Sequence, residues 1–158
     1  MTNDKIQNFT MRVSQANRTE MVTILYDIGQ TYIEDAVNSL KNDNKTQFRV
    51  EVGRVRNTLK ELMNSVDTSQ QLGQNLLELY IFCSSELTKA FIYYSATELY
   101  HVGSIFKKLG DAYREAAKKD LSGPVMANAQ KVYDGITYNR NLTMDSMQTA
   151  DAKRGIYA

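Results

Sequence analysis

The sequence of 158 residues contains only one cysteine, one histidine and one proline. The single cysteine, Cys83, cannot form a disulfide within the chain, so we expect a protein of a reducing compartment. The single histidine, His101, is too few for the paired Glu-x-x-His motifs of di-iron helical bundles. One histidine and one cysteine also leave no ligand set for zinc. We therefore expect neither a metal nor a cofactor.

The chain also has no excess of charge of one sign and no long hydrophobic run. Its 19 Lys and Arg residues nearly balance 18 Asp and Glu residues. A surface that binds phosphates usually shows a basic excess, so we expect no nucleic-acid partner. No stretch approaches the roughly 18 apolar residues of a membrane helix, and the N-terminus has neither the basic region nor the apolar run of a signal peptide. These absences predict a cytoplasmic protein with no membrane insertion.

Catalytic motifs are missing as well. The sequence has no glycine-rich phosphate loop, no Gly-x-Ser-x-Gly elbow and no Cys-x-x-Cys pair. In histidine phosphotransfer domains, which are four-helix bundles, lysine and glycine follow the active histidine, whereas Ser104 and Ile105 stand at these places after His101. The alternative that this chain is a histidine phosphotransfer domain is therefore weak. We predict no catalytic residue and no enzyme activity.

The chain does contain apolar residues at helical spacing over most of its length. The first helix should begin near Asn17 or Thr19, which are capping residues, and end at the turn-forming residues 42–44. Repeats of three and four residues predict further helices across 48–66, 72–90 and 96–116. No segment alternates as a strand does. The expected fold is all-α, an antiparallel up-down four-helix bundle.

Two flanking segments differ from this pattern. Residues 1–17 are polar and are expected to form a mobile N-terminal arm, either frayed or docked in an extended conformation. Pro124 should break the last helix, and Val125 to Asp134 could form a short fifth helix. Because the following residues stay rich in apolar side chains, the tail is expected to fold back on the bundle. The predicted division is an arm at 1–17, a bundle at 18–117 and a C-terminal extension at 118–158.

The first and third predicted helices are apolar over more than half of their circumference. In the first helix, one stripe runs through Met21, Ile24, Leu25, Ile28, Tyr32 and Ala36, and a second through Val22, Tyr26, Gly29, Ile33 and Val37. A helix of a small bundle needs only one such stripe. The second must cover another helix of the chain, a second copy or a partner.

Two sequence blocks resemble one family. The run from Val13 to Asp27 is similar to the pattern Val-x-Thr-Ala-Ser-Pro-x-x-Leu-x-x-x-Leu-Tyr-Asp-Gly, which opens the flagellar secretion chaperones of the FliS family. Val13, Ala16, Leu25, Tyr26 and Asp27 match it in register, while Gln15, Asn17, Arg18 and Ile28 depart from it. The blocks at 61–67 and 74–80 resemble the family's Glu-Leu-x-x-Ser-Leu-Asp and Asn-Leu-x-x-Leu-Tyr elements. The resemblance covers about residues 10–117.

The resemblance implies a cytoplasmic export chaperone whose partner is the C-terminal segment of flagellin. Such a chaperone holds the disordered segment as helices in apolar surface grooves, which prevents premature polymerisation and keeps the cargo competent for export. The candidate partner-binding residues are Val22, Tyr26, Ile33, Asn75, Leu76, Leu79 and Tyr80. The alternative is a self-associating helical scaffold or adaptor with no flagellin role, in which the same faces could serve a homodimer. The C-terminal extension could occupy the groove without cargo or recognise the flagellar export apparatus.

Overall fold

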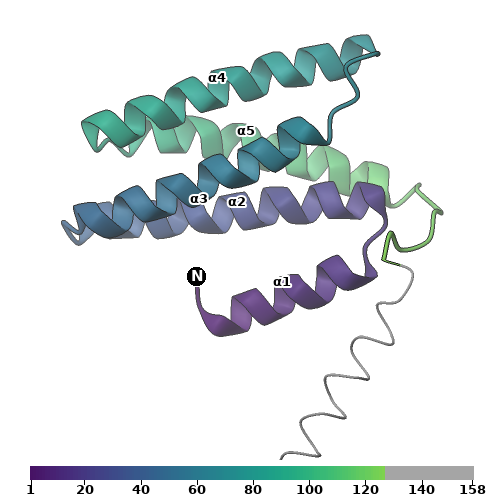
Figure 1. Ribbon diagram of the computed structural model, residues 1–158, viewed down its shortest axis with the longest axis horizontal. Helices are drawn as coiled ribbons and strands as arrows, with labels where there is room; N and C mark the ends of the chain where they lie inside the picture. The colour runs from purple at the N-terminus through teal and green to yellow at the C-terminus, as the bar shows by residue number, and fades with distance from the viewer. Residues whose placement is uncertain (127–158) are drawn as a thin grey trace, which may run out of the picture. The chain divides into compact units, whose positions relative to one another are not determined.

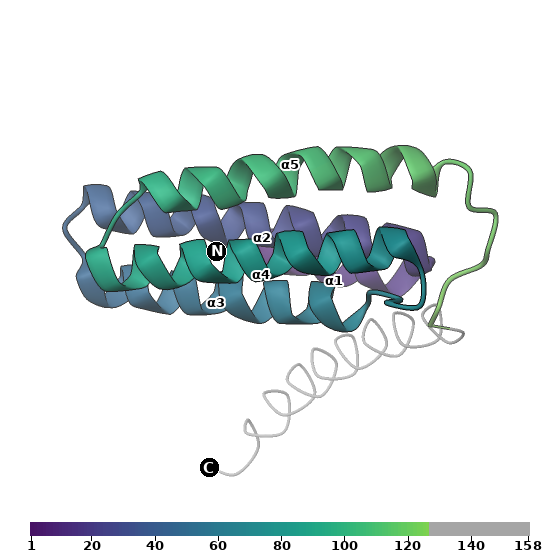
Figure 2. The same ribbon diagram turned by 90° about the horizontal axis from the view of Figure 1, so that it is seen from above.

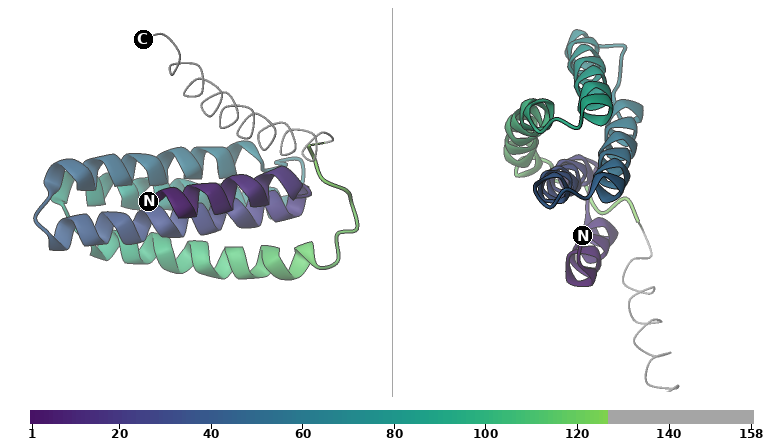
Figure 3. Two further views of the ribbon diagram at one scale, coloured as in Figure 1. Left: turned by 90° about the horizontal axis from the view of Figure 1, so that it is seen from below. Right: turned by 90° about the vertical axis from the view of Figure 1, so that its left-hand side faces the viewer.

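The computed structural model describes residues 1–126, in which all regular structure is helical (Figure 1). It contains five helices: α1 (Asn3–Gln15), α2 (Arg18–Lys41), α3 (Lys45–Asn64), α4 (Gln71–Tyr93) and α5 (Thr97–Ala117). Helices α2 to α5 run side by side (Figures 2 and 3). Helices α2 and α4 occupy opposite corners of the bundle, and α3 and α5 each pack against both of them. This arrangement confirms the predicted all-α bundle. None of the described helices is long and apolar enough to cross a membrane.

Short polar segments set the ends of the helices. The Asn17 side chain accepts from the Glu20 N–H, and the Glu20 carboxylate accepts from the Asn17 N–H, which completes a capping box at the start of α2. The Asn44 side chain caps α3 in a similar way by accepting from the Gln47 N–H. Helix α4 ends at Tyr93, and the next residue, Tyr94, caps it in the left-handed conformation with a φ of 51°. Local side-chain chemistry therefore places these boundaries.

One apolar stripe of each bundle helix fills the core. The predicted seam of α3 is buried at Phe48, Val52, Val55, Leu59 and Leu62. Helix α4 adds Leu76, Tyr80, Cys83, Leu87 and Ala90, and α5 adds Leu99, Val102 and Phe106. Full burial of such a large apolar side chain contributes about 1.5 to 3 kcal/mol, so packing rather than intrinsic propensity stabilises the bundle.

Glycines allow α2 and α5 to approach closely. A Cβ added at Gly29 would lie 2.5 Å from Cε2 of Phe106, and one at Gly110 would lie 3.1 Å from Cβ of Tyr26. Helix α2 also packs more closely against α3 and α5 than α4 does against the same two neighbours. The second apolar stripe of α2 is therefore covered mainly by α5, whereas both flanks of α4 stay more open.

The N-terminal segment differs from the expected frayed or extended arm, because residues 3–15 form helix α1. Ile6, Phe9 and Val13 alternate with polar residues but also fit helical spacing, and Asp4 and Arg12 lie at the ends that the helix dipole favours. Helix α1 packs on α2 without burying any of its own residues. An ion pair of 2.7 Å between Arg12 and Asp27 holds it there. The helix is thus an accessory to the bundle.

The segment after α5 folds back on the corner between α1 and α2. The Thr19 hydroxyl donates to the Asp120 carboxylate over 2.6 Å, and the Val125 N–H donates to the Ala16 carbonyl over 3.0 Å. We call residues 118–126 the strap. The rest of the tail, including residues 127–134 of the predicted fifth helix, lies outside the described residues, and the division at 17 and 117 stays a prediction.

Candidate functional site

Four of the seven candidate residues lie in the core, namely Tyr26, Ile33, Leu76 and Tyr80. Tyr26 is 1% exposed, and its ring meets that of Phe106 edge to face with 5.6 Å between centroids. Its hydroxyl bonds to that of Tyr80, which is also buried, and Ile33 is buried on the same stripe of α2. Tyr26 and Tyr80 are therefore not available to a guest at the surface of this structure, whereas Ile33, although only 4% exposed, lines an open cavity of about 610 Å³ between α2 and α5. The physical reason is the close approach of α5, which sequence periodicity alone did not reveal.

Burial also determines the acid-base state of this core. It raises the pKa of Tyr26, with the hydrogen bond to Tyr80 as the second cause. It raises the pKa of Tyr80 to about 12 despite an opposing effect of the same hydrogen bond, and that of Cys83 to about 12. Both tyrosines and the cysteine thus remain neutral near pH 7. A neutral buried thiol is a packing group rather than a nucleophile.

Val22 and Leu76 lie beside a small cavity at the end of the bundle where α4 begins. The cavity measures about 230 Å³, and Leu72, Gly73 and Tyr113 also line it. Val22 is half-buried and Leu76 is buried. These two candidates could contact only a side chain that enters the cavity.

Asn75 and Leu79 are the two candidates that are open to solvent. Leu79 of α4 is 40% exposed, and Asn75 bonds through Oδ1 to the neighbouring Gln71 side chain over 2.9 Å. Two further α4 side chains, Leu72 at 69% and Phe82 at 46%, are also exposed. Leu72 begins the repeat of three and four residues across 72–90, most of whose later members are buried, yet Leu72 itself lies outside the core. The exposure of Leu72 and Phe82 depends on where α5 lies, which no local pattern reports.

Contacts between α4 and α5 show that these exposed residues border α5. Glu86 bonds to Nδ1 of His101 over 2.7 Å, and Leu79, Phe82 and Glu86 share one side of α4 at spacings of three and four. Ile105 and Leu109 continue the His101 side of α5 and are half-buried. We call the apolar surface formed by Leu72, Leu79, Phe82, Ile105 and Leu109 the α4–α5 face.

A buried carboxylate connects the two helices at one end of this face. Glu86 accepts from Lys89 over 2.7 Å and also bonds to His101. The bond from Lys89 contributes most, and the bond to His101 next, to holding the pKa of Glu86 below its usual range. His101 thus takes part in a contact between helices. Within residues 1–126, no group of three or more His, Cys, Asp or Glu side chains is placed to hold a metal ion.

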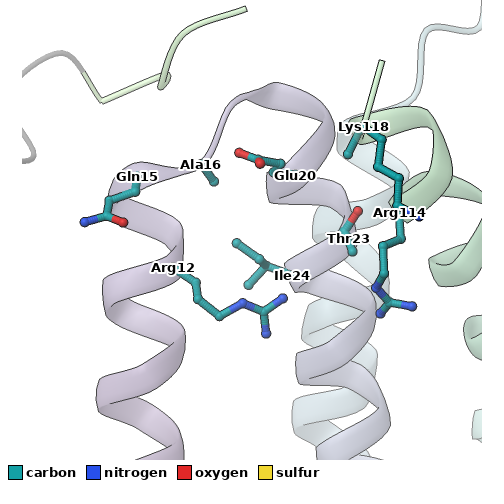
Figure 4. Close-up of a pocket in the computed structure, with 9 residues that line it drawn as sticks. Arg12, Gln15, Ala16, Glu20, Thr23, Ile24, Arg114 and Lys118 are labelled. Carbon is teal, nitrogen blue, oxygen red and sulfur yellow. The ribbon is translucent and has the colours of Figure 1, made fainter. Parts of the chain in front are cut away.

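The residues of the N-terminal signature surround an open cavity between α1, α2 and α5 (Figure 4). The cavity measures about 500 Å³, and Ala16 and Ile24 form part of its wall. Asp27 lies between two arginines, accepting from Arg12 of α1 over 2.7 Å and from Arg114 of α5 over 2.9 Å. The two adjacent residues Tyr26 and Asp27 thus have separate structural roles. Tyr26 packs in the core, whereas Asp27 joins three helices.

Comparison with known proteins agrees with this architecture. A family model described as flagellar protein FliS matches residues 1–120, a span that includes all five helices. A search of curated proteins finds no match. The FliS family consists of flagellar chaperones and is not a family of enzymes. The chain therefore belongs to the flagellar protein FliS family.

Proposed function

We propose that this chain is a cytoplasmic export chaperone that binds the disordered C-terminal segment of flagellin as an amphipathic helix. The observation that carries the proposal is the α4–α5 face, on which Leu72, Leu79 and Phe82 stand exposed beside the apolar side of α5. A contiguous exposed apolar surface on a soluble bundle typically marks an interaction site. Covering the guest's apolar residues would prevent premature polymerisation and keep the segment competent for export.

The geometry of the face suits a helical guest. Leu72, Leu79 and Phe82 are separated by seven and three residues, so they form one row along α4. An amphipathic helix places its own apolar residues at spacings of three and four, and it could lie along this row. Ordering a disordered segment costs about 2 to 5 kcal/mol or more, while each buried Leu or Phe contributes about 1.5 to 3 kcal/mol. A few such contacts can offset the cost and still allow release.

The candidate residues take different roles in this proposal. Leu79 contacts the guest directly, and Asn75 offers an amide to polar groups of the guest backbone. Val22 and Leu76 receive a side chain at the cavity near the start of α4. Tyr26, Ile33 and Tyr80 contribute only indirectly, because they form the core that holds α2, α4 and α5 in place.

Isothermal calorimetry with a peptide of the flagellin C-terminal segment tests the proposal. We expect a stoichiometric complex and a negative heat-capacity change, because apolar surface is buried. The double variant Leu79→Ser/Phe82→Ser should weaken binding at least tenfold. The matched control is Ile92→Ser, which removes an exposed apolar side chain elsewhere on α4 and should leave the affinity within about twofold.

Two results would contradict the proposal. One is the absence of binding at peptide concentrations of roughly tens of micromolar. The other is equal loss of affinity in the double variant and in the control. Sedimentation of the free chain tests the alternative of a self-associating scaffold. A stable dimer that persists when the guest peptide is present and is abolished by Leu79→Ser/Phe82→Ser would favour the scaffold.

A further inference from the structure

A row of basic side chains runs along α3. Lys45, Arg49, Arg56 and Lys60 are exposed and are separated by four, seven and four residues, which places them on one side of the helix. None of the four takes part in an ion pair with another residue of the described part of the chain. On the same helix Glu51 is paired with Arg54 over 2.9 Å, and the exposed Glu61, which follows Lys60, lies about 100° round the helix from it.

Two of these cations show that the row faces α4. The Arg49 guanidinium lies over the rings of Phe91 and Tyr94, at 5.4 and 5.1 Å from their centroids. The Lys45 ammonium lies over the Tyr94 ring at 5.2 Å. Because α3 and α4 are antiparallel, Arg56 and Lys60 continue the row towards the start of α4. The aromatic contacts hold one end of the row and leave the other end open.

The stripe of α4 that borders this row is uncharged, and the exposed Glu78, three residues before Ile81, lies next to it on the outer side of the helix. Phe91 identifies that stripe, and the helical positions before it at spacings of three and four are Thr88, Ser84, Ile81, Leu77 and Gln74. Ile81 is 56% exposed, and Leu77 is half-buried. We call the surface formed by Lys45, Arg49, Arg56 and Lys60 with Leu77, Ile81 and Phe91 the α3–α4 face. It combines unpaired positive charge with an apolar strip.

We propose that the α3–α4 face is a second docking surface, whose partner is a protein segment that forms an acidic amphipathic helix. Carboxylates along one edge of such a helix would pair with the α3 row, while its apolar residues would cover Ile81 and Leu77. The face lies on the flank of α4 opposite to the α4–α5 face, because one flank contacts α3 through Phe91 and the other contacts α5 through Glu86. The inference therefore goes beyond the proposed guest site and does not depend on it.

Charge complementarity favours this occupant over the other candidates. Residues 127–158 contain four Lys or Arg residues and three Asp residues, at Lys131, Arg140, Lys153 and Arg154 and at Asp134, Asp145 and Asp151. That tail offers no acidic run to match the row. A second copy carries the same net charge of +1. A nucleic acid would leave the apolar strip uncovered, whereas an amphipathic helix covers the strip and neutralises the row.

Fluorescence anisotropy with the full chain tests the proposal. The probe is a labelled synthetic helix of about 18 residues, long enough to span most of α3, with Leu along one side and Glu on both flanks. We expect saturable binding that weakens at least tenfold between about 50 mM and about 500 mM salt, because exposed ion pairs are screened. A second probe with Lys in place of every Glu should bind at least tenfold more weakly than the first.

Charge reversal assigns the binding to the face. Arg56→Glu/Lys60→Glu should weaken binding of the Glu probe at least tenfold, and the variant's circular dichroism should match that of the unaltered chain. The matched control is Lys107→Glu/Lys108→Glu, which reverses two exposed charges on α5 and should change affinity less than threefold. Leu79→Ser/Phe82→Ser should leave the Glu probe bound while it weakens the flagellin peptide, which separates failure of one surface from failure of the other.

Several outcomes would overturn the proposal. Equal binding of the Glu and Lys probes would show that charge has no role. Equal loss in the two charge-reversal variants would show that only the net charge of the protein matters. Tighter binding of a single-stranded oligonucleotide of about 12 nucleotides, lost on Arg56→Glu/Lys60→Glu, would assign the face to a nucleic acid instead. A dimer in sedimentation that the same variant dissociates would assign it to a second copy.

Discussion

At the scale of single residues, Tyr26 shows how a family signature can serve the core. Its ring fills space between α2 and α5, and its hydroxyl finds a partner in Tyr80 of α4. The bond connects α2 and α4, which lie at opposite corners of the bundle. As a polar contact inside an apolar core, it favours one relative placement of these two helices. Asp27, the next residue, points to the outer side and joins α1, α2 and α5 through two arginines.

Removing one hydroxyl of the tyrosine pair should destabilise the bundle. We expect Tyr26→Phe to lower the free energy of unfolding by about 1 to 3 kcal/mol, because the buried Tyr80 hydroxyl loses its partner. Urea unfolding measures the change, with Tyr100→Phe at an exposed site of α5 as the control. Tyr26→Phe/Tyr80→Phe should cost less than the sum of the two single variants. Additive costs would show that the hydroxyl pair contributes nothing.

Replacement by alanine at two glycines should change the free energy of unfolding in opposite directions. At Gly29 a Cβ would meet the buried Phe106 ring at 2.5 Å, so Gly29→Ala should destabilise the chain by about 1 to 3 kcal/mol through overpacking. At Gly53 of α3 a Cβ would find nothing within 4 Å, so Gly53→Ala should stabilise by about 0.4 to 1 kcal/mol. Urea unfolding of both variants checks the signs, and a Gly29→Ala variant that is as stable as the unaltered chain or more stable would contradict the packing described between α2 and α5.

At the scale of elements, the helices differ in how firmly they are held. Helices α3 and α5 each pack closely on α2, whereas α4 has two open flanks and α1 has no buried residue. The open flanks of α4 carry both proposed docking surfaces. Because an element with few buried contacts opens at lower free energy, α1 should detach more readily than the bundle helices.

Helix α1 should contribute little to the stability of the bundle. Deleting residues 2–15 should lower the midpoint of thermal unfolding by only a few degrees, because α1 buries no residue and is held by surface ion pairs of about 0.2 to 1 kcal/mol each. Deleting residues 2–17 removes the Asn17 cap as well and should cost about 0.5 to 2 kcal/mol more. Circular dichroism follows both transitions. If the shorter deletion unfolds the chain, α1 is part of the cooperative core.

At the scale of the whole molecule, the strap joins segments that lie far apart in the sequence. Asp120 contacts Thr19 and Asn17, which are about a hundred residues away, at the N-terminal end of α2 where the helix dipole favours a negative charge. Bonds from Ser122 and then from Thr19 lower the pKa of Asp120 to about 2. The charged form of Asp120 is therefore the form that the folded chain favours.

This contact should make stability depend on pH in a defined direction. The pKa of Asp120 is lower in the folded chain, at about 2, than its ordinary value of 3.8. Its contribution is therefore fully present above about pH 4 and is lost as the pH falls towards 2. Asp120→Asn should reduce stability at pH 7 and have little effect near pH 2, as measured by urea unfolding. Glu61→Gln, at an exposed site of α3, serves as the control, and an effect of Asp120→Asn that is the same at both pH values would contradict the assignment.

Local features of the sequence predicted much of the fold. The capping box at Asn17, the turn at 42–44 and the seam from Phe48 to Leu62 act within a few residues, so their positions follow from hydrogen bonding and helical spacing. The same reasoning missed helix α1, because an apolar and polar alternation over residues 6–13 fits both an extended strand and a short amphipathic helix. Packing against α2 selects the helix.

The sequence by itself therefore determined the four bundle helices, the cap at the start of α2 and the family, while the tertiary structure decided which apolar residues reach the surface. Tyr26 and Leu79 both stand on surplus apolar stripes, yet one is buried and the other is exposed. The difference arises because Gly29 and Gly110 let α5 pack tightly on α2, which covers the stripe of Tyr26 and leaves the flanks of α4 more open. Helical spacing tells which side chains share a face of one helix, but only the distance to the neighbouring helix determines whether that face is covered.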